Sequence, residues 1–175
     1  SILGLLPVIP YLQKNSKIIL DAKSGISGAG KSSVENGLEE DIKENFKSYN
    51  VGFHRHQPEI RDFLKTEFNL DHEIIFIPHL LPLFRGEYVT LYCEVSQNDL
   101  DLNELYESYY EKHKLVRVKE KGEIAEIKEV INTFYCDISV SYAFQSNTIV
   151  VNSAIDNLLK GAASQAIQCL DIMSS

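Results

Sequence analysis

The chain has 175 residues, of which 44% are apolar and 24% charged, as expected for a globular domain with a sizeable buried core. Its formal net charge of −8 disfavours nonspecific binding to nucleic acids, whose phosphates are repelled by an acidic surface. The apolar stretch at residues 2–12 is too short to span a bilayer and lacks the basic residues of a signal peptide. We therefore expect one domain, with no nucleic-acid and no membrane partner.

In the first half of the chain, the sequence predicts three helical stretches, one strand and a long loop. The first helix covers residues 2–12, and Pro7 and Pro10 should bend or end it. A strand, a loop rich in glycine and serine and a polar helical stretch follow, at 17–22, 23–37 and 38–47. Pro58 is typical of the first residue of a further helix, which continues from Glu59.

In the second half of the chain, the sequence predicts several strands with helices between them. Asp99 resembles a cap for a helix that runs through Tyr110, and Asp156 should begin a helix that runs through Ile172. The predicted strands are 73–77, 87–95, 115–118, 137–144 and 147–153. This order favours the α+β class, with a mixed, largely antiparallel sheet that helices cover on one face.

Residues 25–32 match the phosphate-binding loop pattern G-x-x-x-x-G-K-[ST]. A functional loop of this kind needs a helix directly after its lysine, with the first amides of that helix facing the phosphates. The residues after Lys31 instead contain an Asn-Gly turn signal, four acidic residues and little apolar periodicity. We interpret the match as accidental and keep a P-loop nucleotide-binding protein as an alternative.

The same loop, with its flanks, is one of four segments that resemble a known enzyme family. Residues 21–30, DAKSGISGAG, resemble the D-[AS]-K-S-G-x-S-G-A-G segment of N-acetyl-gamma-glutamyl-phosphate reductases, a branch of the semialdehyde dehydrogenases. Three more segments follow in that family's order: HRHQPEI at 54–60, FIPHLLPLFRG at 76–86 and AIDNLLKGAA at 154–163. The resemblance extends from Ser1 to about Met173.

The resemblance implies that residues 1–175 form the second, catalytic and dimerisation domain of such a reductase. The expected fold is then that of the C-terminal domain of glyceraldehyde-3-phosphate dehydrogenase. The Rossmann domain and the nucleophilic cysteine would be absent from this chain, which alone should be inactive. The implied reaction is the NADP-dependent reductive dephosphorylation of N-acetyl-gamma-glutamyl phosphate to N-acetylglutamate semialdehyde in arginine biosynthesis. A related reductase that acts on a carrier-linked or aminoadipyl substrate shares these segments, and it remains an alternative interpretation of the sequence.

The histidine pair His54 and His56 comes just before a predicted helix, and histidine exchanges protons near neutral pH. The resemblance makes one of the two the general base. We favour His56, with Glu59 able to fix its ring.

Other site residues follow from the remaining segments. Arg85 carries a planar guanidinium that suits capture of a carboxylate or phosphate, and Ser24 is a second candidate for substrate binding. A loop of small residues can approach a cofactor closely. The resemblance assigns NADP contacts to Ser27, Gly28, Asn157 and Lys160.

The remaining expectations concern cysteines, partners and compartment. Cys93, Cys136 and Cys169 are widely spaced and lie in apolar contexts, which indicates neither a disulfide framework nor a metal site. We therefore expect no metal and a cytoplasmic protein. The predicted helices suffice to cover only one face of the sheet, so we expect the other face to meet a second copy of the chain. The expected apolar strand surface consists of Tyr88, Val89, Leu91, Phe134, Ile138, Val140, Tyr142, Ile149 and Val151.

Overall fold

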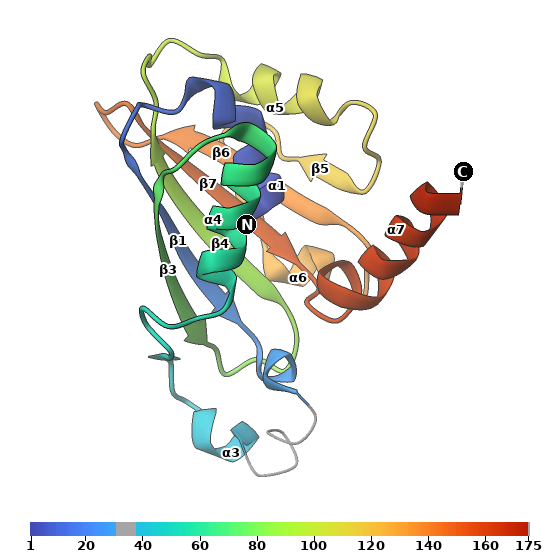
Figure 1. Ribbon diagram of the computed structural model, residues 1–175. Helices are drawn as coiled ribbons and strands as arrows, with labels where there is room; N and C mark the ends of the chain where they lie inside the picture. The colour runs from blue at the N-terminus through green and yellow to red at the C-terminus, as the bar shows by residue number, and fades with distance from the viewer. Residues whose placement is uncertain (31–37, 175) are drawn as a thin grey trace.

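A mixed sheet of seven strands, in the order β2-β3-β1-β4-β7-β6-β5, runs through the domain (Figure 1). The computed structural model describes residues 1–30 and 38–174. β1 is parallel to β3 and β5 to β6, whereas the other neighbouring pairs are antiparallel. The strands are β1 Lys17–Ser24, β2 Lys47–Ser48, β3 Glu73–Leu80, β4 Glu87–Glu94, β5 Val116–Val118, β6 Cys136–Tyr142 and β7 Thr148–Ile155.

The helical elements are short, apart from three that reach two turns or more. The α-helices are α1 Ile2–Leu5, α3 Leu38–Ile42, α4 His56–Phe68, α5 Leu102–Tyr110, α6 Ile127–Val130 and α7 Ser164–Ser174. Two 3-10 segments, η1 Leu6–Tyr11 and η2 Ile26–Ala29, and one π-helical turn, η3 Leu159–Ala163, complete them. No helix in these described parts of the chain is long and apolar enough to cross a membrane.

Local sequence signals account for most of these boundaries. The predicted helix at 2–12 is bent as expected, because its α-helical turn gives way to 3-10 geometry over the segment that contains Pro7 and Pro10. The predicted cap Asp99 is wrong. Asp101 caps α5 instead, and its carboxylate accepts the Glu104 amide at 3.2 Å, three residues into the helix as an N-cap requires.

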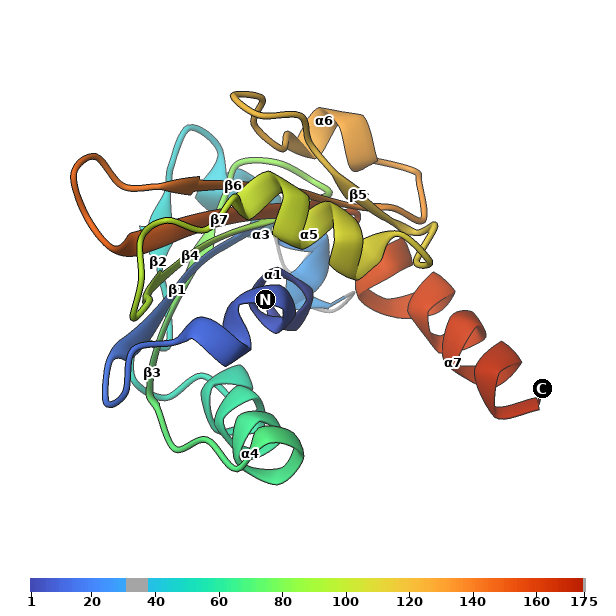
Figure 2. The same ribbon diagram turned by 90° about the horizontal axis from the view of Figure 1, so that it is seen from above.

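The core lies between one face of the sheet and α1, α4 and α5, which lie on the same side of it (Figure 2). Alternate strand residues point into this core, as a period of two dictates. The expected surface for self-association was partly wrong, because several of its residues belong to this covered face. Val89, Leu91, Ile138, Ile149 and Val151 are each at most 3% exposed.

The second face of the sheet is covered over only part of its width. Ala125 and Val130 pack there against Ala154 of β7, and Tyr88 joins this cluster. The fold is therefore the expected α+β class, but α6 lies against the face opposite the longer helices. Towards β1, β3 and β4 the same face presents a patch of half-buried apolar residues, which we call the bare patch: Ile19, Ile75, Ile77, Tyr92 and Val150.

The first turn of the chain is joined to α5 by a buried hydrogen bond. The phenol of Tyr106, which is fully buried, donates to the carbonyl oxygen of Gly4 at 2.6 Å. We expect Tyr106→Phe to lower the free energy of unfolding by about 1–3 kcal/mol, because the carbonyl would stay buried without its donor. Urea denaturation measures the change. Tyr109→Phe is the matched control on the same helix, where the side chain is 44% exposed, and equal losses in both variants would contradict this account.

Candidate functional site

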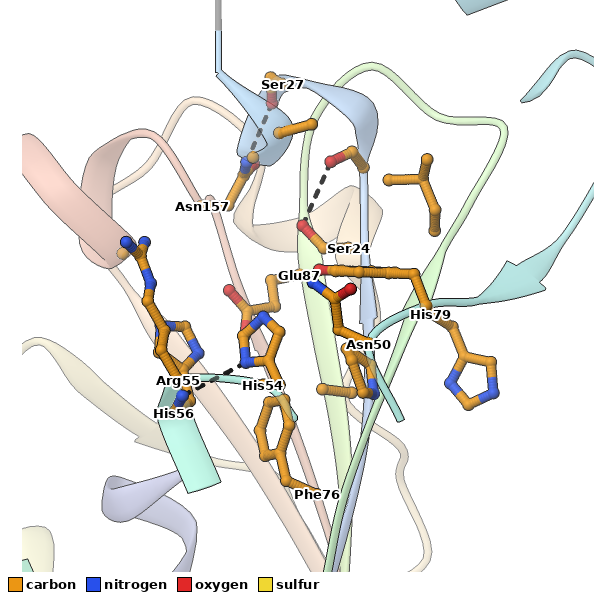
Figure 3. A pocket seen from close by; sticks show the side chains of 18 of the residues that line it. Ser24, Ser27, Asn50, His54, Arg55, His56, Phe76, His79, Glu87 and Asn157 are labelled. Carbon is orange, nitrogen blue, oxygen red and sulfur yellow. Dashed lines mark hydrogen bonds between the residues drawn. The ribbon is translucent and has the colours of Figure 1, made fainter. Parts of the chain in front are cut away.

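A cleft of about 1090 Å³ opens at one end of the sheet. The carboxyl ends of β1 and β3, the start of β4 and the residues after β7 meet there, and the chain between α3 and α4 forms the opposite wall (Figure 3). All four segments singled out in the sequence contribute lining residues. The sheet therefore assembles a site from segments that are far apart in the sequence.

The loop after β1 is held against the turn before β4 by backbone hydrogen bonds. The amides of Gly25, Ile26 and Ser27 donate to the carbonyls of Gly86, Leu83 and Phe84 at 2.8, 2.9 and 2.9 Å. A side chain at Gly25 would meet the Phe84 carbonyl at 2.8 Å, so this close approach requires glycine.

These bonds also bear on the P-loop alternative. A phosphate-binding loop presents free amides to its ligand, whereas these three amides already donate to carbonyls. The lysine of the pattern, Lys31, lies outside the described residues. The structure therefore does not favour nucleotide binding by this loop.

Asn157, which follows β7, also holds the loop after β1 in place. Its Oδ1 accepts the amide of Gly86 at 2.7 Å, and its Nδ2 donates to Oγ of Ser27 at 2.9 Å. The amide Nδ2 carries a second proton, and Asn157 is one of the residues that line the cleft. Gly28 completes this end of the cleft, since a Cβ there would come within 2.8 Å of Ser24 Oγ. The wall at this end therefore consists of backbone and small polar side chains packed closely together.

The histidine pair lies at the other end of the cleft, at the start of α4 (Figure 3). The His54 ring stacks on Phe76 with centroids 5.0 Å apart and meets the rings of Tyr49 and His56 edge-on at 5.7 and 4.6 Å. Burial, with the neighbouring charges of His56 and Arg55, lowers the pKa of His54 from its ordinary value. The pair therefore occupies two different environments within one cleft.

Three predicted site residues do not join this cleft. Glu59 is exposed in the first turn of α4, while the ring of His56 contacts His54 and Phe76. Lys160 is buried and donates to Oε1 of Gln168 at 2.7 Å, beside a separate cavity of about 70 Å³. These side chains point elsewhere because helix packing, which the sequence does not display, sets their directions.

Arg85 is the third residue outside the cleft. Its Nη1 donates to Oδ1 of Asn132 at 2.8 Å and to Oδ2 of the fully buried Asp156 at 3.2 Å. Its guanidinium therefore neutralises an interior carboxylate, a role that the sequence does not reveal because Asp156 is distant along the chain.

Sequence reasoning missed other groups that line the cleft. The rings of Tyr49 and Phe76 contact the ring of His54, and Glu87 at the start of β4 lines the same cleft; Figure 3 labels Phe76 and Glu87. Arg55 is exposed and also lines the cleft. Its place between the two histidines was the available signal. Among the described residues, no three His, Cys, Asp or Glu side chains gather as a metal site would require.

Asp156 connects the cleft to the start of the C-terminal helix. Burial by itself would raise its pKa, but donors outweigh burial and hold the pKa below its usual value. These donors are the amides of Asn132, Leu158 and Leu159, at 2.8, 2.9 and 3.1 Å, together with Arg85. The prediction that Asp156 begins a helix is confirmed in its hydrogen bonds, although η3 forms the first turn.

We expect Asp156→Asn to destabilise the fold by about 1.5–3 kcal/mol at neutral pH, since it weakens charge-assisted hydrogen bonds. A lowered folded pKa means that the carboxylate contributes stability above its unfolded pKa and loses this contribution as pH falls through the folded pKa. The difference from wild type should therefore shrink below about pH 4. Urea denaturation between pH 7 and pH 3 measures it, with Asp62→Asn on the exposed face of α4 as control. A difference that is constant with pH would refute the role of the charge.

The fold is that of the semialdehyde dehydrogenases. The chain superposes on aspartate semialdehyde dehydrogenase II from Vibrio cholerae with a TM-score of 0.76 at 16% identity, covering 99% of this chain and 58% of that one. A probable aspartate-semialdehyde dehydrogenase from Pseudomonas aeruginosa gives 0.77 at 14% identity, covering 98% and 58%. Residues 1–157 match the family model for the semialdehyde dehydrogenase dimerisation domain, and the chain belongs to that family.

Closer relatives are N-acetyl-gamma-glutamyl-phosphate reductases. The protein of that name from Thermoanaerobacter sp. (strain X514) is 41% identical over 175 residues, and that from Halothermothrix orenii is 42% identical over 177. The alignments cover 98% and 99% of this chain but 51% of each relative. The chain thus spans about half the length of these relatives.

Proposed function

We propose that this chain is the catalytic and dimerisation domain of an NADP-dependent N-acetyl-gamma-glutamyl-phosphate reductase. A Rossmann domain and a nucleophilic cysteine would lie in the other half of the full-length protein, which we assign to the cytoplasm. The observation that carries the proposal is one cleft with a histidine pair at one end and the Ser27–Gly28–Asn157 loop at the other. The names of the relatives favour the acetylated substrate over a carrier-linked or aminoadipyl one.

The small-residue end of the cleft fits a nicotinamide. Asn157 keeps one amide proton after its two bonds to Gly86 and Ser27, and a carboxamide oxygen can accept it. Gly28 has no side chain because a Cβ there would lie 2.8 Å from Ser24 Oγ, so the wall at this end consists of backbone and small polar groups. When bound, NADPH supplies the hydride that reduces an acyl group to an aldehyde. This chain holds the nicotinamide ring at the end of the cleft opposite the histidines.

The histidine end serves the proton transfers. The proposed cysteine must lose its proton before its sulfur attacks the acyl carbon, and the phosphate then leaves with the electron pair of the broken C–O bond. His56 is the general base that takes the thiol proton. Arg55 lines the cleft and carries the positive charge for an anionic substrate, whereas Arg85 already neutralises Asp156. Ser24 lies on the cleft wall between the two ends (Figure 3).

We expect the full-length protein to reduce the acyl phosphate with NADPH, and His56→Asn to lower kcat by about 10²–10⁴-fold, the usual loss for a missing general base. Absorbance of NADPH follows the reaction. His113→Asn, an exposed histidine after α5, is the control and should leave kcat unchanged. ATP turnover without reductase activity would refute the proposal in favour of the P-loop alternative.

We also propose that a second copy of the chain covers the bare patch. The matched family model describes a dimerisation domain, and the patch joins apolar residues of four adjacent strands in one surface. We expect the protein to be an oligomer at tens of micromolar in light scattering, and Ile77→Lys to shift it to monomer. Ile124→Lys, at a residue 54% exposed outside the patch, should not. A wild-type monomer would contradict this arrangement.

A further inference from the structure

His54 accepts a hydrogen bond that determines which of its nitrogens carries a proton. The backbone amide of His56 donates to Nδ1 of His54, with 3.3 Å between the two nitrogens. His56 is the first residue of α4, so its amide has no partner within the helix and needs an acceptor outside. A ring nitrogen accepts only when it is unprotonated. The neutral ring therefore carries its proton on Nε2.

The surroundings of the ring favour this neutral form. Its face is covered by Phe76, and the positive end of the α4 dipole disfavours an imidazolium at the same place. Burial lowers the pKa of His54, and the positive charge of Arg55 on the same segment acts in the same direction. Glu87 and Tyr49 are the titratable groups that face the ring end of the cleft from other elements, and the Asp41–Lys47 pair and His79 line its far wall.

The Nε2 atom lies on the cleft side of the ring. In Figure 3 the nitrogen opposite the bonded Nδ1 points towards the space between Ser24 and Asn157. The stack on Phe76 and the bond to the His56 amide hold the ring in this orientation. A substrate in the cleft would thus meet a fixed N–H donor, with no reorganisation needed at the moment of reaction.

We propose that His54 is a neutral hydrogen-bond donor, whose Nε2–H binds the acyl oxygen, while His56 alone transfers protons. The proposal rests on the function proposed above. When sulfur adds to the acyl carbon, the π electron pair of the carbonyl moves to its oxygen. His54 donates a hydrogen bond to this oxygen and keeps its proton. The pair then returns to re-form the carbonyl as the C–O bond to phosphate breaks.

The same contact argues against His54 as the base. A base needs a free lone pair on the atom that faces the cleft, which would move the ring proton to Nδ1. That proton would point at the amide proton of His56 and replace an attraction by a repulsion. The two histidines of one segment therefore have different roles, because only His54 accepts the first amide of the helix.

Nitrogen-15 NMR of histidine-labelled full-length protein tests the tautomer directly. We expect His54 to be a neutral ring with its proton on Nε2 from pH 8 down to below about 6.5, the pH at which an ordinary histidine is half protonated. His54→Gln provides the assignment. A proton on Nδ1, or an imidazolium at pH 7, would overturn the proposal whatever the protein's activity.

Steady-state kinetics of His54 variants test its role as a hydrogen-bond donor. The amide nitrogen of glutamine reaches about the position of Nε2 and donates without acting as a base. We therefore expect His54→Gln to retain kcat within about tenfold, while His54→Leu loses about 10²–10³-fold, as for other lost oxyanion donors. The acidic limb of the pH profile should persist in His54→Gln.

Two experimental outcomes distinguish a failure of the His54 proposal from a failure of the proposed reductase function. If His54→Gln is as slow as His54→Leu, or if it loses the acidic limb, His54 is not a simple donor although the reductase function stands. If the wild-type protein lacks reductase activity, the proposed function itself is refuted, and with it the acyl oxygen as the partner of His54.

Discussion

The side-chain amide of Asn157 is the contact on which the cleft depends. It joins the start of the C-terminal segment to the turn before β4 and to the loop after β1, at 2.7 and 2.9 Å. Backbone bonds from Gly25 to Ser27 complete the attachment. The loop after β1 is thus held in place relative to the rest of the cleft. Such positioning is required if a hydride and a proton are to be transferred within the same cleft.

The charges of the interior are arranged differently from those of the cleft. Asp156 and Asp137 are fully buried, and each meets an arginine, Arg85 or Arg117, in addition to other donors. Buried carboxylates need such partners, since an unpaired charge in the interior is costly. Arg55 and Glu87 in the cleft, by contrast, lie where a ligand can reach them. The same residue types therefore serve stability in one place and the proposed chemistry in another.

The two faces of the sheet have different partners. One carries the core beneath α1, α4 and α5, while on the other, among the described residues, Ala125 and Val130 pack against Ala154 of β7 and Tyr88 of β4. Sequence periodicity identifies strands with apolar residues but does not say which alternate set is under the helices. Val89 and Leu91 were expected on the free surface for this reason, and they are core residues.

The sequence by itself determined the fold class, six of the seven strands and the family, because local periodicity, prolines and four ordered segments are all visible along the chain. It missed the two-residue strand β2, whose first residue lies in a stretch predicted to be helical. It also brought forward His54, His56, Ser24, Ser27, Gly28 and Asn157, all of which line the cleft. Only the tertiary structure decided that Arg85 pairs with Asp156, that Lys160 lies buried beside Gln168, and that Glu87, Tyr49 and Phe76 line the cleft with the histidines. The reason is physical: a side chain's partner depends on how distant elements pack and on strand register, and neither is encoded in the spacing of residues along the chain.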